Sequence, residues 1–142
     1  MAVRIRPLRL ADHAAYVDLL GLADLHPRVR GRDSRAAFAR QLRSNRTAYL
    51  GAFEGARLVG VVLGTHDTRK GWINRLAVHP AWRRRGIASR LVRACERSLR
   101  SEGIEVFAAL IEPDNNASMA FFERLGYART DIAYVRRKLR DV

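Results

Sequence analysis

The segment with the clearest chemical meaning joins the end of an apolar strand to the start of a helix through three arginines and a glycine. It runs from Leu76 to Leu91 and reads LAVHPAWRRRGIASRL. The first N–H groups of a helix have no partner within it, and the helix dipole adds positive charge at that end. Gly86 lacks a Cβ, so an anion can approach the main chain, and arginine side chains add bidentate contacts. The segment predicts a phosphate-binding site, the alternative being a solvated basic loop.

Apolar periodicity indicates the elements that position this site. Alternating or continuous apolar runs predict strands, and a spacing of three to four residues predicts helices. We expect strands at residues 3–8, 48–53, 58–65, 71–78, 105–111 and 132–139. We expect helices at residues 13–22, 34–44, 85–101 and, after a cap at Asn115 or Asn116, up to Gly126. The phosphate-binding segment then lies between the fourth strand and the third helix.

The order of these elements predicts a three-layer α/β/α fold of the α+β class, with a mixed, mostly antiparallel sheet. Short turns after residues 53 and 65 favour an antiparallel meander. The run 105–111 is apolar after its first residue, which is typical of a central strand covered on both faces. No linker or repeat interrupts the chain, so we expect residues 1–142 to form one domain.

The net charge of +13 comes almost wholly from arginine. Such a surface attracts a polyphosphate cofactor, an acidic substrate or nucleic acid. The arginines are scattered over every element, with no basic face interleaved with aromatic residues, which argues against nucleic acid. With no signal peptide and no membrane-spanning run in the sequence, we expect a cytoplasmic protein without a membrane partner.

Cys95 is the single cysteine of the chain. An intrachain disulfide and a thiolate metal cluster are therefore excluded, and we expect no metal site. Cys95 falls on the apolar stripe of the third helix together with Ile87, Leu91 and Leu99. This position predicts a core residue and not a nucleophile.

Two motifs carry a resemblance to a known family. Arg83, Gly86 and Ala88 match an Arg/Gln-x-x-Gly-x-Gly/Ala motif that follows a Val-x-Pro strand end. The run NNASMAFFERLGY, from Asn115 to Tyr127, resembles a second signature that ends in Leu-Gly-Phe/Tyr. Both signatures are those of the GNAT superfamily of N-acetyltransferases, and YVRRKL at 134–139 is similar to its last strand. The likeness covers essentially the whole chain.

The resemblance implies an acetyl-CoA-dependent N-acetyltransferase with a sheet that is splayed at its centre. The strands 71–78 and 105–111 are then expected to part at their C-terminal ends and to hold the thioester in the opening. Backbone amides of residues 84–89 are expected to hold the diphosphate, and the end of the fourth strand the pantetheine arm. The implied cofactor-binding residues are Leu76, Val78, Arg83, Arg84, Arg85, Gly86, Ile87, Ala88, Ser89, Asn115 and Phe122.

The implied reaction is direct attack of a neutral amine on the thioester carbonyl. It needs a donor for the oxyanion, and we expect a backbone N–H of Ala77 or Val78 to provide it. The chain departs from the family at both proton-handling positions. Phe122 stands where a tyrosine acid is often found, and Asn74 where a glutamate base is often found. Neither side chain can exchange a proton.

Two interpretations of these departures remain open. Either the reaction needs no dedicated acid, because a leaving thiol has a pKa of only about 8.5. Or Glu112 substitutes as base, and Tyr127 or Tyr134 as acid. The alternative for these three residues is structural, with a solvated carboxylate and two packed tyrosines.

The acceptor is expected to be a primary amine of a small molecule, a peptide or a protein. Related folds receive it beside the loop between the first two helices, where this chain has Asp24, His26 and Arg28, although these also fit an exposed polar loop. The missing proton-handling residues favour a second hypothesis, a regulatory module that binds acyl-CoA without turnover. A homodimer is compatible with the resemblance.

Overall fold

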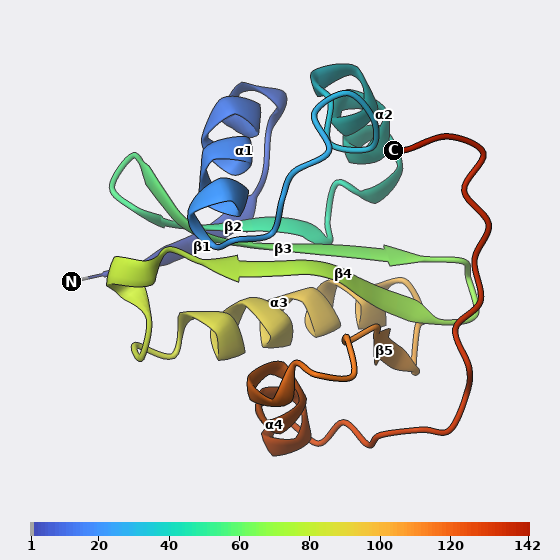
Figure 1. Ribbon diagram of the computed structural model, residues 1–142. Coiled ribbons are helices and arrows are strands. Elements are labelled where there is room, and N and C mark those ends of the chain that lie inside the picture. Colours follow the sequence, from blue (N-terminus) through green and yellow to red (C-terminus); the bar gives the residue numbers. More distant parts are fainter. Residues whose placement is uncertain (1) are drawn as a thin grey trace.

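The computed structural model describes residues 2–142 as an open five-stranded sheet with helices on both faces. Figure 1 shows α1 and α2 on one face of the sheet and α3 and α4 on the other. The strands are β1 (Arg4–Pro7), β2 (Tyr49–Glu54), β3 (Arg57–His66), β4 (Gly71–Val78) and β5 (Phe107–Ala109). The helices are α1 (His13–Leu22), α2 (Arg35–Asn45), α3 (Ile87–Ser101) and α4 (Asn116–Arg124), with short 3-10 turns η1 (Leu10–Asp12) and η2 (Pro80–Trp82). The predicted three-layer arrangement is confirmed.

The sheet is mixed, as expected. Its strands lie in sequence order, and β1 to β4 form an antiparallel meander. β5 pairs with β4 in parallel. A parallel pair needs a crossover connection, and α3 provides it on one face of the sheet.

Helix α3 fills the core on its side of the sheet. Leu91, Cys95 and Leu99 are fully buried against the strands, which confirms the predicted core position of Cys95. The helix comes this close because glycine lines the sheet: a Cβ on Gly64 would collide with the Cys95 sulfur, and one on Gly71 would stand 2.7 Å from Leu99. Burial, and then the nearby Glu96, raise the pKa of the Cys95 thiol to about 12, so it stays protonated.

A second cluster packs α1 and α2 onto the opposite face. Tyr16 and Phe38 are fully buried, and their rings stack with centroids 5.0 Å apart. The hydroxyl oxygen of Ser34 accepts the Ala37 N–H at 3.1 Å and caps the start of α2. These contacts fix the loop between α1 and α2 over β3 and β4. Within the described residues, no helix has the length and apolar character that crossing a membrane requires.

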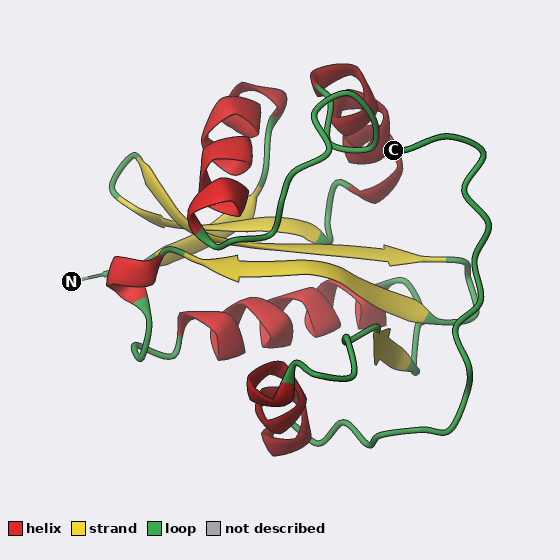
Figure 2. Ribbon diagram, viewed as in Figure 1, coloured by secondary structure: helices red, strands yellow, loops and turns green. Residues whose placement is uncertain are grey.

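Two expected strands differ in the structure. β5 spans only Phe107–Ala109, and it lies at the edge of the sheet instead of its centre. Residues 128–142 form no strand, so the prediction of a strand at 132–139 is wrong. Figure 2 shows this segment as a loop that leaves α4 and ends beside α2. The two differences are connected, because a sixth strand beyond β5 would have made β5 central.

Candidate active site

The sheet opens between β4 and β5. Their pairing covers Gly71 with Phe107, Trp72 with Ala108 and Ile73 with Ala109, and it ends there. β4 continues to Val78 without a partner on this side. The expected splay of the two strands at their C-terminal ends is therefore confirmed. It leaves an open backbone edge along the second half of β4.

A β-bulge lies where the two strands separate. Leu63 of β3 pairs with Arg75 and Gly64 with Ile73, so Asn74 is the extra residue. Its side chain donates to the Thr65 hydroxyl at 2.8 Å. One extra residue turns all following side chains to the other face of the sheet. Ile73 accordingly packs on the α3 side, whereas Arg75 turns toward the α1–α2 loop.

The direction of the backbone groups on β4 follows from its pairing with β3. The His79 N–H donates to the Val59 carbonyl at 2.8 Å. Opposed residues in an antiparallel pair alternate between exchanging hydrogen bonds and exchanging none. By this alternation the N–H of Ala77 points to β3, while those of Leu76 and Val78 point to the gap. The sequence suggested the N–H of Ala77 or of Val78 as the oxyanion donor, and the register directs only that of Val78 to the gap.

The start of α3 presents main-chain amides to solvent. Gly86 is the residue before the helix, with φ of 76°, and no side chain caps the first turn. The amides of Ile87, Ala88 and Ser89 therefore have no side-chain acceptor. The space where a Cβ of Gly86 would stand is open, and Arg83 to Arg85 are exposed. The helix begins two residues later than expected, because the positive φ of Gly86 is incompatible with helix.

Trp82 attaches the loop between β4 and α3 to the sheet. Its indole N–H donates to Glu54 of β2 at 2.8 Å. The guanidinium carbons of Arg57 and Arg85 lie 4.6 and 5.7 Å from the centre of the Trp82 ring. His79 packs edge-on against the same ring. These contacts give Trp82 a packing role and fix the loop that leads into α3.

Asp33 connects the α1–α2 loop to β4, and sequence reasoning missed it. It is 4 % exposed, and its carboxylate accepts from the Tyr16 hydroxyl at 3.0 Å, the Arg28 N–H at 2.7 Å and the Arg75 guanidinium at 3.1 Å. Arg75 also donates to the Leu25 carbonyl at 3.0 Å. Burial, and then the Asp33 carboxylate, raise the pKa of Tyr16 far above its usual value. No pattern in the sequence distinguished Asp33 from its polar neighbours.

The loop residues expected near an acceptor are mostly in solvent. His26 Nε2 and Asp24 Oδ1 are 3.5 Å apart, and their side chains are 80 % and 89 % exposed. Arg28 is exposed as well, although its backbone N–H is bound by Asp33. The part of this loop that reaches β4 is therefore Leu25 and Asp33, through Arg75.

The residues considered for proton transfer lie apart from one another. The Tyr127 hydroxyl donates to Glu96 of α3 at 2.6 Å, and burial followed by this bond raises the pKa of Tyr127 well above its usual value. Tyr134 is 63 % exposed in the segment after α4. Glu112 is exposed beyond the end of β5. For Tyr127 these surroundings favour a role other than proton donation.

The second motif forms α4 and its cap. The Asn115 side-chain oxygen accepts the Ser118 N–H at 3.1 Å and starts the helix. Phe122 is 6 % exposed, and its ring lies 5.1 Å from that of Tyr127 in an edge-on arrangement. Asn115 thus caps α4, and Phe122 packs against Tyr127.

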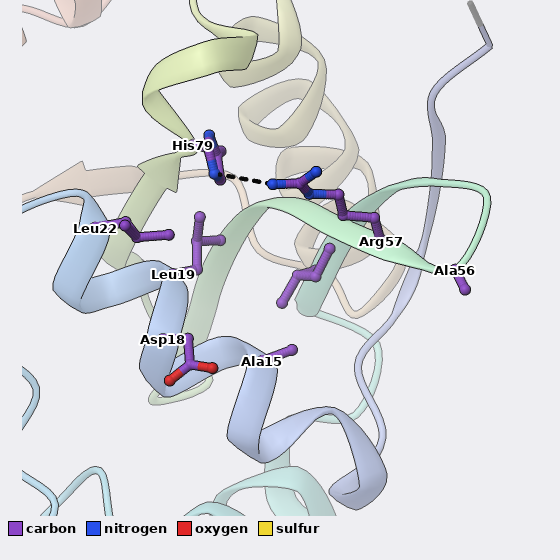
Figure 3. Close-up of a pocket in the computed structure, with 8 residues that line it drawn as sticks. Ala15, Asp18, Leu19, Leu22, Ala56, Arg57 and His79 are labelled. Atoms are coloured by element: carbon purple, nitrogen blue, oxygen red, sulfur yellow. Dashed lines mark hydrogen bonds between the residues drawn. The ribbon is translucent and has the colours of Figure 1, made fainter.

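A hollow of about 300 Å³ opens on the other face of the sheet, between α1 and the β2–β3 turn (Figure 3). Asp18 and Leu22 line it from α1, Arg57 lines it from β3, and His79 lines it from the loop after β4. The Arg57 Nη2 and His79 Nε2 atoms are 3.4 Å apart across its rim. Because α3 covers the opposite face, this hollow is separate from the predicted phosphate site. Residues 2–142 contain no group of three side chains suited to hold a metal ion.

Comparison with known proteins decides the family. Residues 16–127 match the model of the acetyltransferase (GNAT) family. The chain belongs to the GNAT acetyltransferase family. It is accordingly an N-acetyltransferase, and its acetyl donor is acetyl-CoA.

Solved structures share the GNAT fold at low sequence identity. PaiA N-acetyltransferase from Thermoplasma acidophilum, solved with coenzyme A, is 17 % identical, with a TM-score of 0.82 and 94 % of each chain covered. Ribosomal-protein-alanine N-acetyltransferase from Brucella melitensis is 24 % identical, with a TM-score of 0.73 over 96 % of this chain and 100 % of that one. The aminoglycoside acetyltransferase HMB0005 from an uncultured soil metagenomic sample is 22 % identical, with a TM-score of 0.78 over 99 % and 100 %.

The residues of this GNAT chain fit an acetyl-CoA molecule at the β4–α3 junction. The first turn of α3 offers uncapped amides beside an exposed glycine, which suits a diphosphate. The edge of β4 offers unpaired backbone groups at Leu76 and Val78, which suit the amides of a pantetheine arm. The two surfaces are joined by one loop, so one extended ligand can contact both.

Proposed function

We propose that this GNAT enzyme acetylates the primary amine of a peptide or small molecule in the gap between β4 and β5. One observation carries the proposal: the chain has free backbone amides at both ends of the β4–α3 loop. Those of Leu76 and Val78 face the gap, and those of Ile87 to Ser89 begin α3 uncapped. When bound, acetyl-CoA supplies the acetyl group as a thioester.

We assign the diphosphate to the first turn of α3. The amides of Ile87, Ala88 and Ser89 donate to it, and Gly86 leaves room for its approach. The exposed side chains of Arg83, Arg84 and Arg85 add positive charge around the same point. The backbone of Leu76 and the carbonyl group of Val78 pair with the arm, while Asn115 and Phe122 border it from the cap and the body of α4.

For the carbonyl oxygen of the thioester we propose the Val78 N–H as donor. Its direction toward the gap, inferred from the β3–β4 register, supports this choice. Ala77 contributes by its hydrogen bonding to β3, which fixes the strand on which Val78 sits. A donor already held in position stabilises the developing negative charge without reorganisation during the reaction.

For proton transfer we propose a reaction without a dedicated acid. Phe122 has no proton to give, and Tyr127 donates its proton to Glu96. A thiol with a pKa of about 8.5 leaves readily as the thiolate, so an acid is dispensable. Glu112 is exposed and has no ion-pair partner in the described chain, and we propose it as the base that takes the proton of the amine. Glu112→Gln should then lower kcat/KM most at low pH, with Asp114→Asn as the control.

On the side of the α1–α2 loop the gap is bordered by an excess of positive charge, while Glu112 lies on the side of β5. The α1–α2 loop carries exposed Arg28, Arg30 and Arg32, and Arg75 joins this loop to β4. A polycationic amine is repelled by such a surface, whereas an amine next to carboxylates is attracted. We therefore propose a peptide with acidic residues near its amino terminus, in preference to an aminoglycoside.

Thiol release from acetyl-CoA tests the function. The panel should contain acidic, neutral and basic peptides, an aminoglycoside and simple primary amines, because proteins of similar fold act on ribosomal-protein alanine and on aminoglycosides. Turnover should appear with acidic peptides and disappear in Gly86→Trp. Gly103→Trp is the matched control, since Gly103 also has positive φ and open space but lies at the other end of α3. Turnover that survives in Gly86→Trp would contradict the assigned site.

A second candidate is a regulatory module that binds acetyl-CoA without turnover. It is favoured by Asn74, whose side chain is bound to Thr65, and by the buried Phe122. The same panel separates the two. Thermal stabilisation by acetyl-CoA with no thiol release for any amine would support the regulatory module.

A further inference from the structure

The hollow between α1 and the β2–β3 turn lies outside the parts of the chain assigned to acetyl-CoA. Its volume of about 300 Å³ is at the lower end of the range for small-molecule sites. Ala56 of the turn and Ala15 of α1 both line it. Because these two side chains are small, the space between the helix and the turn stays open.

The inner wall of the hollow is apolar. Ala15, Leu19 and Leu22 follow one another at spacings of four and three residues, so they lie on one face of α1. Leu58 of β3 lines the same space, and Figure 3 shows Leu19 and Leu22 between α1 and His79. Leu19 is buried, whereas Leu22 is 57 % exposed. The sheet therefore covers this face of the helix only in part, and an apolar group in the hollow would remove Leu22 from water.

His79 presents a hydrogen-bond donor at the rim of the hollow. Its Nδ1 atom accepts the Ala81 N–H at 3.0 Å. A neutral imidazole whose Nδ1 accepts carries its proton on Nε2, and a protonated imidazole carries a proton there as well. The bond from Ala81 thus assigns the tautomer, and Nε2 is a donor in both forms.

Arg57 directs a second donor to the same point. Its Nη2 atom lies 3.4 Å from His79 Nε2. A hydrogen bond between these two atoms, drawn as a dashed line in Figure 3, needs the other tautomer, which would give up the shorter bond from Ala81. Two N–H groups therefore converge, and an acceptor beside them satisfies both. Among residues 2–142, Arg57 has no ion-pair partner, and the Glu54 carboxylate accepts from the Trp82 indole instead.

The charges around the hollow favour a ligand with a single negative charge. Two converging N–H groups match the two oxygens of a carboxylate. Asp18 also lines the hollow, and it too has no ion-pair partner in the described part of the chain. Its charge opposes a doubly charged anion such as phosphate more strongly than a carboxylate.

We propose that this hollow is a second ligand site, which binds a small carboxylate with an apolar chain. The carboxylate lies at Arg57 and His79, and the chain lies against the leucines of α1 and β3. Arg57 and His79 also contact the Trp82 ring, so the site adjoins the loop assigned to acetyl-CoA without overlapping it. This inference does not depend on the acceptor or on the catalytic residues.

An NMR titration with hexanoate tests the site. The methyl resonances of Leu19, Leu22 and Leu58 should shift and saturate, with a Kd of about 1 mM or lower for a ligand of this size. The uncharged hexanamide should bind roughly 3- to 10-fold more weakly, because the charge-assisted bonds are lost. The shifts should persist when the protein is saturated with acetyl-CoA. Displacement by acetyl-CoA, equal binding of the amide, or the absence of saturable shifts would overturn the proposal.

Substitutions at the rim locate the carboxylate. Arg57→Gln and His79→Asn should each raise the Kd for hexanoate roughly 3- to 10-fold. Asparagine at this position keeps an acceptor oxygen for the Ala81 N–H and removes the Nε2 donor. Asp18→Asn should lower the Kd or leave it unchanged, because it removes a repulsive charge. Weaker binding in Asp18→Asn, or unchanged binding in both other variants, would place the carboxylate elsewhere and refute the assignment.

Filling the hollow tests its apolar part. Ala15→Phe should raise the Kd for hexanoate by at least about tenfold, because the ring occupies the space of the chain. Ala14→Phe is the matched control, since Ala14 is an exposed neighbour on α1 that does not line the hollow. Undiminished binding in a folded Ala15→Phe variant would contradict the site. Inorganic phosphate should not shift the leucine methyl resonances, and phosphate binding there as tightly as hexanoate would show a general anion site instead.

Discussion

Replacing Ser89 by Asp should weaken acetyl-CoA binding and at the same time stabilise the free protein. Ser89 is the third residue of α3, in the turn whose amides lack a side-chain cap. A carboxylate there interacts favourably with the helix dipole, by about 0.3 to 1 kcal/mol. The same charge repels a diphosphate bound to those amides. The two effects have opposite signs, so a general loss of folding cannot imitate them.

The size of the repulsion follows from distance and exposure. At a separation of roughly 6 Å, two unit charges repel by about 0.7 kcal/mol in water and by about 2.8 kcal/mol at an effective dielectric constant near 20. Ser89 is half-buried, which places it between these limits. The Kd for acetyl-CoA should therefore rise roughly 3- to 100-fold. The melting temperature of the free protein should rise by about 1 to 4 °C.

Isothermal titration calorimetry and thermal unfolding measure the two effects on the same preparations. Ser89→Asn is the matched control, because it has nearly the shape of Asp without the charge. The difference in affinity between the two variants should shrink at high salt, since exposed charges are screened. Equal dissociation constants for folded Asp and Asn variants would refute the assignment of the diphosphate to this turn.

Three further predictions concern the scaffold. Gly64→Ala should destabilise the fold by about 1 to 3 kcal/mol, because its Cβ collides with the Cys95 sulfur; adding Cys95→Ala should restore part of the loss in denaturant titrations, and purely additive effects would contradict this. Because burial raises the pKa of Cys95 from 9.0 to about 12, the unfolded thiol ionises first, so this group should lower stability by roughly 1 kcal/mol between pH 8 and 10. Cys95→Ala should lessen the fall by that amount and leave the part that comes from Tyr16, Tyr49 and Tyr127, whose pKa values burial also raises. Asp33→Asn should cost about 2 to 4 kcal/mol and raise the KM for the amine acceptor, because Arg75 loses its carboxylate and the loop its attachment; Asp141→Asn, in an exposed pair, should change stability by less than about 1 kcal/mol.

Local signals made much of the fold predictable. The apolar stripe of α3 has a helical period, and Asn115 and Ser34 provide the side-chain oxygens that cap helices. The sequence also predicted the β4–α3 motif, because the residues that form it are neighbours in one loop. Gly86 takes its positive φ and α3 starts immediately after it. Such features depend on contacts between residues close together in the chain, so the sequence is enough to predict them.

The pairing of the strands in the folded protein determined the features that the sequence did not predict. The bulge at Asn74 depends on the register between β3 and β4, and it alone determines that Arg75 faces the α1–α2 loop. Asp33 becomes important only because β4 brings Arg75 beside it.

The sequence by itself determined the fold class, the amphipathic helices and the anion-binding turn. It also indicated strands at 105–111 and 132–139. An alternating or apolar pattern shows only that a segment can form a strand, and it does not identify the strand with which the segment pairs. A helix closes its hydrogen bonds within itself, whereas a strand depends on a neighbour. For this reason the helices followed the prediction within about two residues, while the length of β5 and the course of the final segment were decided by the tertiary structure alone.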